Sequence, residues 1–103
     1  MGNNMITEML VGLNVVDEAA YQRYRDEIAP ILESHTGGFG YDFKVSDVLK
    51  SPTEAPINRL FTIYFSTEDS MNAFFTNEAY LKIKQRHFAG SVADTTTIAT
   101  YER

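Results

Sequence analysis

Side chains able to carry acid–base chemistry gather at the ends of the two helices that the sequence predicts. His35 ends the first helix, shortly ahead of a glycine pair and near Tyr41. Because an imidazole titrates near neutral pH, His35 is a candidate catalytic base at the mouth of a pocket, with Tyr41 as a candidate ligand-binding residue. The alternative interpretation is a helix-terminal side chain that bonds the last free carbonyl groups.

Arg86 and His87 end the second predicted helix and form another candidate site. A cationic pair at this place would hold a substrate carboxylate or enolate, with Arg86 as the ligand-binding residue and His87 as the catalytic base. The alternative is a pair of cations that complements the negative end of the helix dipole and bonds Asp17 or Glu18. Both interpretations place the pair near the start of the first helix.

Two tyrosines are candidates for orienting a ligand. Tyr24 and Tyr80 are predicted to point inward at the middle of the layer between helices and sheet. Each would bind a ligand through its hydroxyl, or would simply pack in the core with one satisfied hydrogen bond. The two interpretations differ in whether a cavity lies beside the rings.

Glu8 is the lone charge in the middle of the predicted far face of the sheet, away from the helices. Burying an unpaired carboxylate is costly, so we expect Glu8 to pair with Lys44 or with a residue of a partner chain. A raised pKa of its carboxyl group would mark Glu8 as a catalytic candidate.

The sequence offers no set of metal ligands and no cofactor motif. It contains no cysteine, and its two histidines are predicted at opposite ends of the layer. Spacings typical of zinc sites, nucleophile elbows and phosphate-binding glycine loops are missing, so we expect neither a metal nor a cofactor.

Length and charge narrow the class of protein further. The 103 residues suffice for a single domain that spans the chain, and 44% of them are hydrophobic, as in an ordinary globular protein. The net charge of −5 argues against a nucleic-acid partner, and no apolar run is long enough to cross a membrane. Residues 1–4 lack the pattern of a signal peptide, and we expect them to be disordered or vector-derived in a cytoplasmic protein.

Hydrophobic periodicity predicts a strand over residues 6–15 and then a helix that begins at Asp17. Residues at helical spacing form the expected buried stripe: Ala20, Tyr24, Ile28, Ile31 and His35. Pro30 should kink or split this helix, and Gly37 and Gly38 should supply the positive φ that ends it.

The rest of the chain reads as two strands, a helix and a final strand. In residues 39–45, apolar residues at odd positions alternate with polar ones, which predicts an edge strand with its odd side chains on one face. A loop over residues 50–58 precedes a strand over 60–65. Ser66 should cap the second helix, which is interrupted at Asn77, capped again there, and ended by Gly90. The last strand is expected over residues 92–101.

This βαββαβ order predicts a ferredoxin-like α+β fold, with an antiparallel sheet in the order 4-1-3-2 and both helices on one face. The odd residues of the two central strands, such as Val11 and Ile63, are assigned to the helix side. The far face carries Leu10, Leu60 and Tyr64 and is too apolar for open water. We therefore expect a second copy of the chain to cover it in a homodimer.

Several short motifs resemble the bacterial family called domain of unknown function 1330. They are the Tyr21-x-x-Tyr24 pair, Pro30, Leu32, the segment 35–39 and the segment 74–86. The resemblance implies the dimeric α+β barrel superfamily, with a dimer and a cleft between helices and sheet. That superfamily includes cofactor-free monooxygenases, haem-degrading enzymes, lactone isomerases and ligand-sensing modules, so the resemblance implies no single chemistry.

Two functions of different classes follow from these expectations. The first is a homodimeric module that binds a small, partly apolar metabolite in the helix–sheet cleft. The second is a cofactor-independent monooxygenase or isomerase acting on a carbonyl or aromatic compound, with His35 or His87 as base and Arg86 stabilising an enolate. An apolar pocket in which one of these three groups meets a tyrosine would favour the enzyme.

Overall fold

Four strands form one antiparallel sheet in the order β2-β3-β1-β4, which is the predicted order read from the other edge. The computed structural model describes residues 5–103, so the expectation about residues 1–4 lies outside the described residues. The strands are β1 (Thr7–Val15), β2 (Gly37–Lys44), β3 (Arg59–Phe65) and β4 (Val92–Glu102). β1 and β3, the two most apolar strands, occupy the centre.

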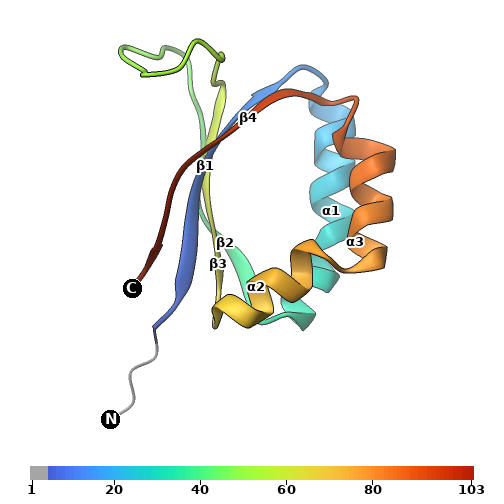
Figure 1. Ribbon diagram of the computed structural model, residues 1–103. Helices are drawn as coiled ribbons and strands as arrows, with labels where there is room; N and C mark the ends of the chain where they lie inside the picture. Colours follow the sequence, from blue (N-terminus) through green and yellow to red (C-terminus); the bar gives the residue numbers. More distant parts are fainter. Residues whose placement is uncertain (1–4) are drawn as a thin grey trace.

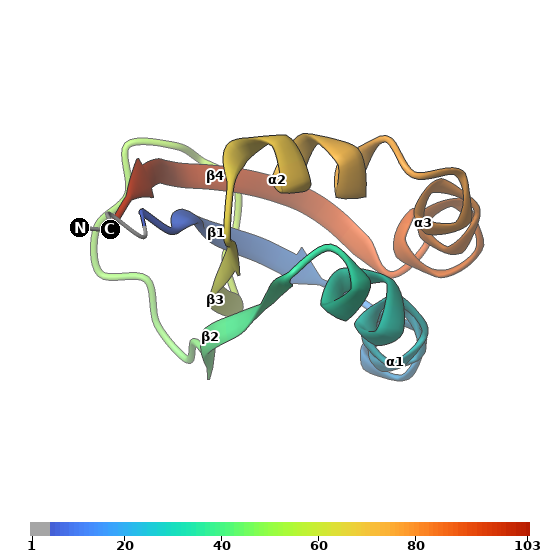
Figure 2. The ribbon, with the colours of Figure 1, turned by 90° about the horizontal axis from the view of Figure 1, so that it is seen from below.

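All helices cover one face of this sheet (Figure 1). They are α1 (Glu18–Ser34), α2 (Glu68–Phe75), α3 (Glu78–Ile83) and the π-helix η1 (Lys84–Phe88), which continues α3. α1 and α3 lie side by side, whereas α2 crosses the end of the layer and connects β3 to α3 (Figures 1 and 2). The predicted second helix therefore consists of three pieces.

Side-chain caps explain where the helices begin. Asp17 accepts a hydrogen bond from the Ala20 amide at 3.1 Å, and Asn77 caps α3 as predicted, accepting from the Tyr80 amide at 3.0 Å. The cap of α2 is Thr67 instead of Ser66, because the Ser66 hydroxyl is bonded to Thr36. α1 continues through Pro30 without a break, so the helix is not split there.

The end of α1 differs from the prediction. Thr36 takes the left-handed conformation, with φ of 57°, and no glycine among residues 5–103 has a positive φ. The hydroxyl of Thr36 bonds Ser66, which helps to hold a conformation that costs a non-glycine residue about 1 kcal/mol. Gly37 is needed for a different reason: a Cβ on it would lie 2.8 Å from the carbonyl oxygen of Tyr64.

The core lies between the helices and the inner face of the sheet, as the strand pattern predicts. Val11, Leu13, Phe61, Ile63 and Phe65 are buried there. The buried stripe of α1 is rotated slightly from the predicted one and consists of Tyr21, Tyr24, Ile28 and Leu32.

A bulge in β2 overturns the expected alternation of that strand. Phe39 pairs with Ile63 and Asp42 pairs with Phe61, so the ladder shifts register between them. Such a bulge reverses which residues face the helices. Asp42 and Lys44 consequently face α1, whereas the strand pattern places them on the opposite side from Phe39.

Candidate functional site

A cavity of about 260 Å³ lies between the helices and the inner face of the sheet. Most of its wall is aromatic or aliphatic, and its polar groups are three phenols, one ammonium and two threonine hydroxyls. The lining residues are Met9, Val11, Leu13, Tyr21, Tyr24, Phe39, Phe61, Ile63, Phe75, Tyr80, Lys84, Phe88, Thr95 and Thr97. An apolar concave site with a few polar groups is the usual form of a small-molecule site.

Tyr24 and Tyr80 meet in the wall of this cavity. Their hydroxyl oxygens are 3.0 Å apart, and the residues are only 7% and 3% exposed. Burial raises the pKa of both phenols, so both are neutral near physiological pH. Two hydroxyls bonded to each other use one of their two protons, and no other side chain of residues 5–103 accepts the second one.

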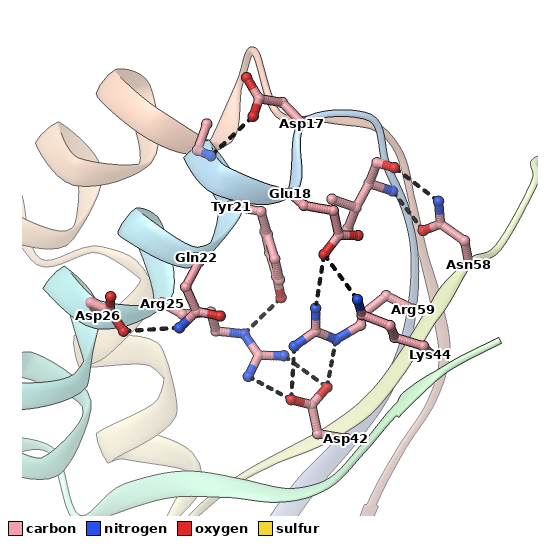
Figure 3. Close-up of polar contacts among 12 residues, drawn as sticks. Asp17, Glu18, Tyr21, Gln22, Arg25, Asp26, Asp42, Lys44, Asn58 and Arg59 are labelled. Atoms are coloured by element: carbon pink, nitrogen blue, oxygen red, sulfur yellow. Dashed lines mark hydrogen bonds and ion pairs between the residues drawn. The ribbon is translucent and has the colours of Figure 1, made fainter.

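Tyr21 is held in place by a cluster of charged residues at one side of the cavity (Figure 3). Its hydroxyl accepts a hydrogen bond from Arg25 Nε at 2.7 Å. The guanidinium of Arg25 also lies 3.7 Å from the centre of the Phe39 ring, a cation–π contact. Arg25 thus positions two residues of the cavity wall, one on α1 and one on β2.

Asp42 binds two arginines from different elements in this cluster. It accepts hydrogen bonds from Arg59 Nε at 2.8 Å and Nη2 at 2.9 Å, and from Arg25 Nη1 at 3.2 Å. The bonds from Arg59, more than the nearby charge of Arg25, hold the pKa of Asp42 below its usual value, and the same bonds raise the pKa of Arg59. Glu18 completes the cluster through ion pairs with Arg59 at 3.8 Å and Lys44 at 3.7 Å.

The sequence reasoning missed this charged cluster. It treats Asp42 as a solvent-facing residue of a regular strand, but the bulge turns the carboxylate toward α1. Gly40 was the available signal, because an isolated glycine inside a strand pattern indicates a bulge. A Cβ at this position would lie 2.5 Å from Thr62 Oγ1, which accepts the Tyr41 amide at 2.8 Å.

His35 lies at the end of α1 and is not among the residues that line the cavity. Its Nδ1 donates to the carbonyl oxygen of Ile31 at 2.8 Å, and its ring packs edge-on against Phe74 at 5.9 Å. This geometry matches the interpretation of His35 as a helix-terminal residue that bonds free carbonyl groups.

Arg86 and His87 turn toward Glu27 in the middle of α1, instead of toward Asp17 or Glu18. His87 Nε2 lies 2.7 Å from one oxygen of Glu27, and Arg86 Nη1 lies 3.6 Å from the other. Neither residue lines the cavity, although their neighbours Lys84 and Phe88 in η1 do. Of the six candidate site residues, only Tyr24 and Tyr80 line the cavity.

Tyr41 and Glu8 lie on or near the outer face of the sheet, on the side away from the cavity. Tyr41 is 68% exposed and stacks on Phe43 at 5.7 Å. Glu8 is 6% exposed and bonds Arg103 and Tyr101, whereas the expected partner Lys44 contacts Glu18. Burial raises the pKa of Glu8, but the bonds from Arg103 and Tyr101 outweigh it and leave the pKa below its ordinary value.

The described part of the chain shows neither a metal centre nor a membrane span. No group of three or more histidine and acidic side chains within residues 5–103 is arranged to hold a metal ion. No helix in the same range is long and apolar enough to cross a bilayer.

The four-stranded antiparallel sheet with helices on one face places this chain among the ferredoxin-like α+β proteins. More specifically, it belongs to the family described as Domain of unknown function (DUF1330), whose model matches residues 9–101. No curated protein is significantly similar to it in sequence.

Solved structures with the same fold differ widely in sequence. A protein of unknown function from Rhodopseudomonas palustris is 14% identical, with a TM-score of 0.77 over 98% of this chain and 82% of the other. A putative antibiotic biosynthesis monooxygenase from Nitrosomonas europaea and a dimeric ferredoxin-like protein of unknown function from Thermobifida fusca are each 11% identical. Each of these two has a TM-score of 0.56 over 100% of this chain and 93% of the other. At such identities the likeness establishes the fold alone.

Proposed function

We propose that this protein binds a small, partly apolar molecule in the cavity between the helices and the sheet. The observation that supports the proposal most strongly is the Tyr24–Tyr80 pair, a polar group buried in an otherwise apolar cavity wall. Apolar walls supply affinity by removing ligand surface from water, and a few fixed polar groups orient the ligand.

The size of the cavity fits an aromatic compound. An apolar cavity of about 150 Å³ is large enough to hold benzene. This cavity measures about 260 Å³, and seven aromatic residues line it. A molecule with one or two rings would fill the space and contact the aromatic wall on several sides.

A larger side chain on β4, the edge strand that lines the cavity, tests the proposal. Thr97 of β4 pairs with Val11 of β1, and both residues line the cavity. Thr96 pairs with Gly12 and faces the other side of the sheet. Titration calorimetry with 2-naphthylacetamide, a neutral aromatic probe, should show saturable binding to the wild type. Thr97→Phe should weaken this binding about tenfold or more, because the new ring occupies the ligand space.

Thr96→Phe is the matched control, since it adds the same ring on the other face. It should leave the affinity within about twofold of the wild type. Equal weakening by both variants, or no saturable binding to the wild type, would contradict the proposal.

The outer face of the sheet supports a second element of the proposal, a homodimer. Leu10 and Leu60 are only partly buried in the single chain, and Phe43 is half exposed beside Tyr41. The chain covers part of this face itself, because Ile57 packs over Gly12. An apolar face that remains partly open is typical of a surface that binds another protein.

Light scattering at micromolar concentration measures the assembly directly. We expect a mass of twice the 11.7 kDa of one chain. Phe43→Ser, at an exposed position of β2 on this face, should shift the mass toward that of one chain, whereas the fold measured by circular dichroism should persist. A wild-type protein with the mass of one chain would overturn the dimer and leave ligand binding untouched.

A cofactor-independent monooxygenase or isomerase that acts on a carbonyl or aromatic compound is the second candidate. The Tyr24–Tyr80 hydroxyls favour it, since a neutral phenol can donate a hydrogen bond to an enolate oxygen. Binding is better supported than catalysis, because His35 and His87 bond elsewhere. Oxygen uptake with quinol substrates tests this candidate, and unchanged turnover in the double variant His35→Ala/His87→Ala would remove both histidines as bases.

A further inference from the structure

We propose that the natural ligand of the cavity is an aromatic carboxylate whose anionic group binds Lys84. This inference rests on the proposed function and adds the chemical class of the ligand. Its starting point is the set of polar groups in the wall, which includes one cation and no carboxylate among the lining residues of the described chain. The lining residues therefore carry one positive charge and no negative one, although the whole chain carries a net charge of −5.

Lys84 carries a positive charge that no acidic side chain among the described residues neutralises. Its neighbours Arg86 and His87 share Glu27, whereas no ion pair joins Lys84 to an acidic side chain within residues 5–103. An exposed lysine normally needs no partner, but this one lines a cavity whose other walls are largely apolar. Lys84 can therefore bind a ligand anion without first breaking an ion pair with a protein carboxylate.

The position of Lys84 suits an anion at the edge of an apolar site. Its ammonium group lies 5.7 Å from the centre of the Phe88 ring, and both residues line the cavity. Because Lys84 is exposed, a carboxylate bound there stays in contact with water while its apolar part enters the cavity. This arrangement avoids the large cost of burying an unpaired charge.

The interior of the cavity offers only neutral donors and acceptors. The pKa of Tyr21, like that of Tyr24 and Tyr80, is raised by burial, so none of these phenols adds a negative charge that would repel an acid. The unshared proton of the Tyr24–Tyr80 pair can be donated to an oxygen of the ligand. Charge and hydrogen-bond capacity together fit an anionic ligand better than a cationic one.

A matched pair of probes and a matched pair of variants test the inference. 2-Naphthylacetate and 2-naphthylacetamide have nearly the same shape and differ in charge. Calorimetry on the full chain should show that the wild type binds the carboxylate about tenfold or more tightly than the amide, as a charge-assisted hydrogen bond allows. Lys84→Gln should reduce this ratio to about twofold or less, with most of the loss falling on affinity for the carboxylate.

Lys82→Gln is the control, because it removes the same charge from an exposed position that does not line the cavity. It should keep the preference for the carboxylate. An equal loss of this preference in both variants would overturn the inference, because the overall charge of the protein and not Lys84 itself would then cause it. A wild type that binds both probes equally would overturn the inference and leave the proposed function standing. Failure of both probes to bind would overturn both.

Discussion

Asp42 links the two arginines that stand at one side of the cavity. Arg25 comes from α1 and Arg59 from β3, and their side chains are only 10% and 12% exposed. Two guanidinium groups this close would repel each other without a carboxylate between them. Asp42 therefore stabilises the contact between helix and sheet, and through Arg25 it fixes Tyr21 in the cavity wall.

The pH dependence of stability should reveal this role. The pKa of Asp42 in the fold lies below its ordinary 3.8, so its carboxylate contributes stability that is fully present above that value. The contribution is lost as the pH falls through the folded pKa. Urea titrations from neutral pH downward should thus show wild type more stable than Asp42→Asn by a constant amount, with the difference shrinking below about pH 4. A difference that persists unchanged to the lowest pH at which both fold would contradict this assignment.

Individual residues were predictable from sequence only where regular elements determine their direction. Tyr24 and Tyr80 were expected to point inward because they lie on helical stripes, and both line the cavity. Lys84 was not singled out, because the π-helical turn of η1 could not be read from the periodicity of an α-helix. That turn places Lys84 in the cavity wall, while Arg86 bonds Glu27.

At the scale of elements, the sequence predicted which strands and helices form but not how each one ends. The order of strands and the break at Asn77 follow from hydrophobic pattern and capping chemistry. The bulge in β2 and the left-handed Thr36 depend on contacts with β3 and the start of α2, which are distant in sequence. A local pattern can signal an irregularity, as Gly40 does for the bulge, but it does not specify such contacts.

Two glycines provide a test of the tight connection between α1 and β2. A Cβ on Gly37 would meet the carbonyl oxygen of Tyr64, a backbone atom that cannot move without shifting β3. Gly37→Ala should lower the free energy of unfolding by about 1–3 kcal/mol in urea titrations.

Gly90 serves as the control, because nothing lies within 4 Å of the position of its Cβ. Gly90→Ala should be neutral or stabilise by up to about 1 kcal/mol, since it restricts only the unfolded chain. Similar losses in the two variants would show that steric contact at Gly37 is not the reason for its glycine.

At the scale of the whole molecule, the two faces of the sheet differ in what they offer a binding partner. The inner face packs against the helices but leaves a cavity among the aromatic residues. The outer face exposes Tyr41 and Phe43 and retains a paired, buried Glu8. We propose that the inner face binds the ligand and that the outer face associates with a second copy.

Methyl NMR of the full-length protein during titration with 2-naphthylacetate distinguishes the two faces most directly. Val11, Leu13 and Ile63 line the cavity, whereas Leu10 and Leu60 lie on the outer face. We predict saturable shifts of the first three residues that fit one dissociation constant, with little change at the other two. Shifts confined to Leu10 and Leu60, or no saturation at any methyl group, would contradict the assignment of the ligand site to the cavity.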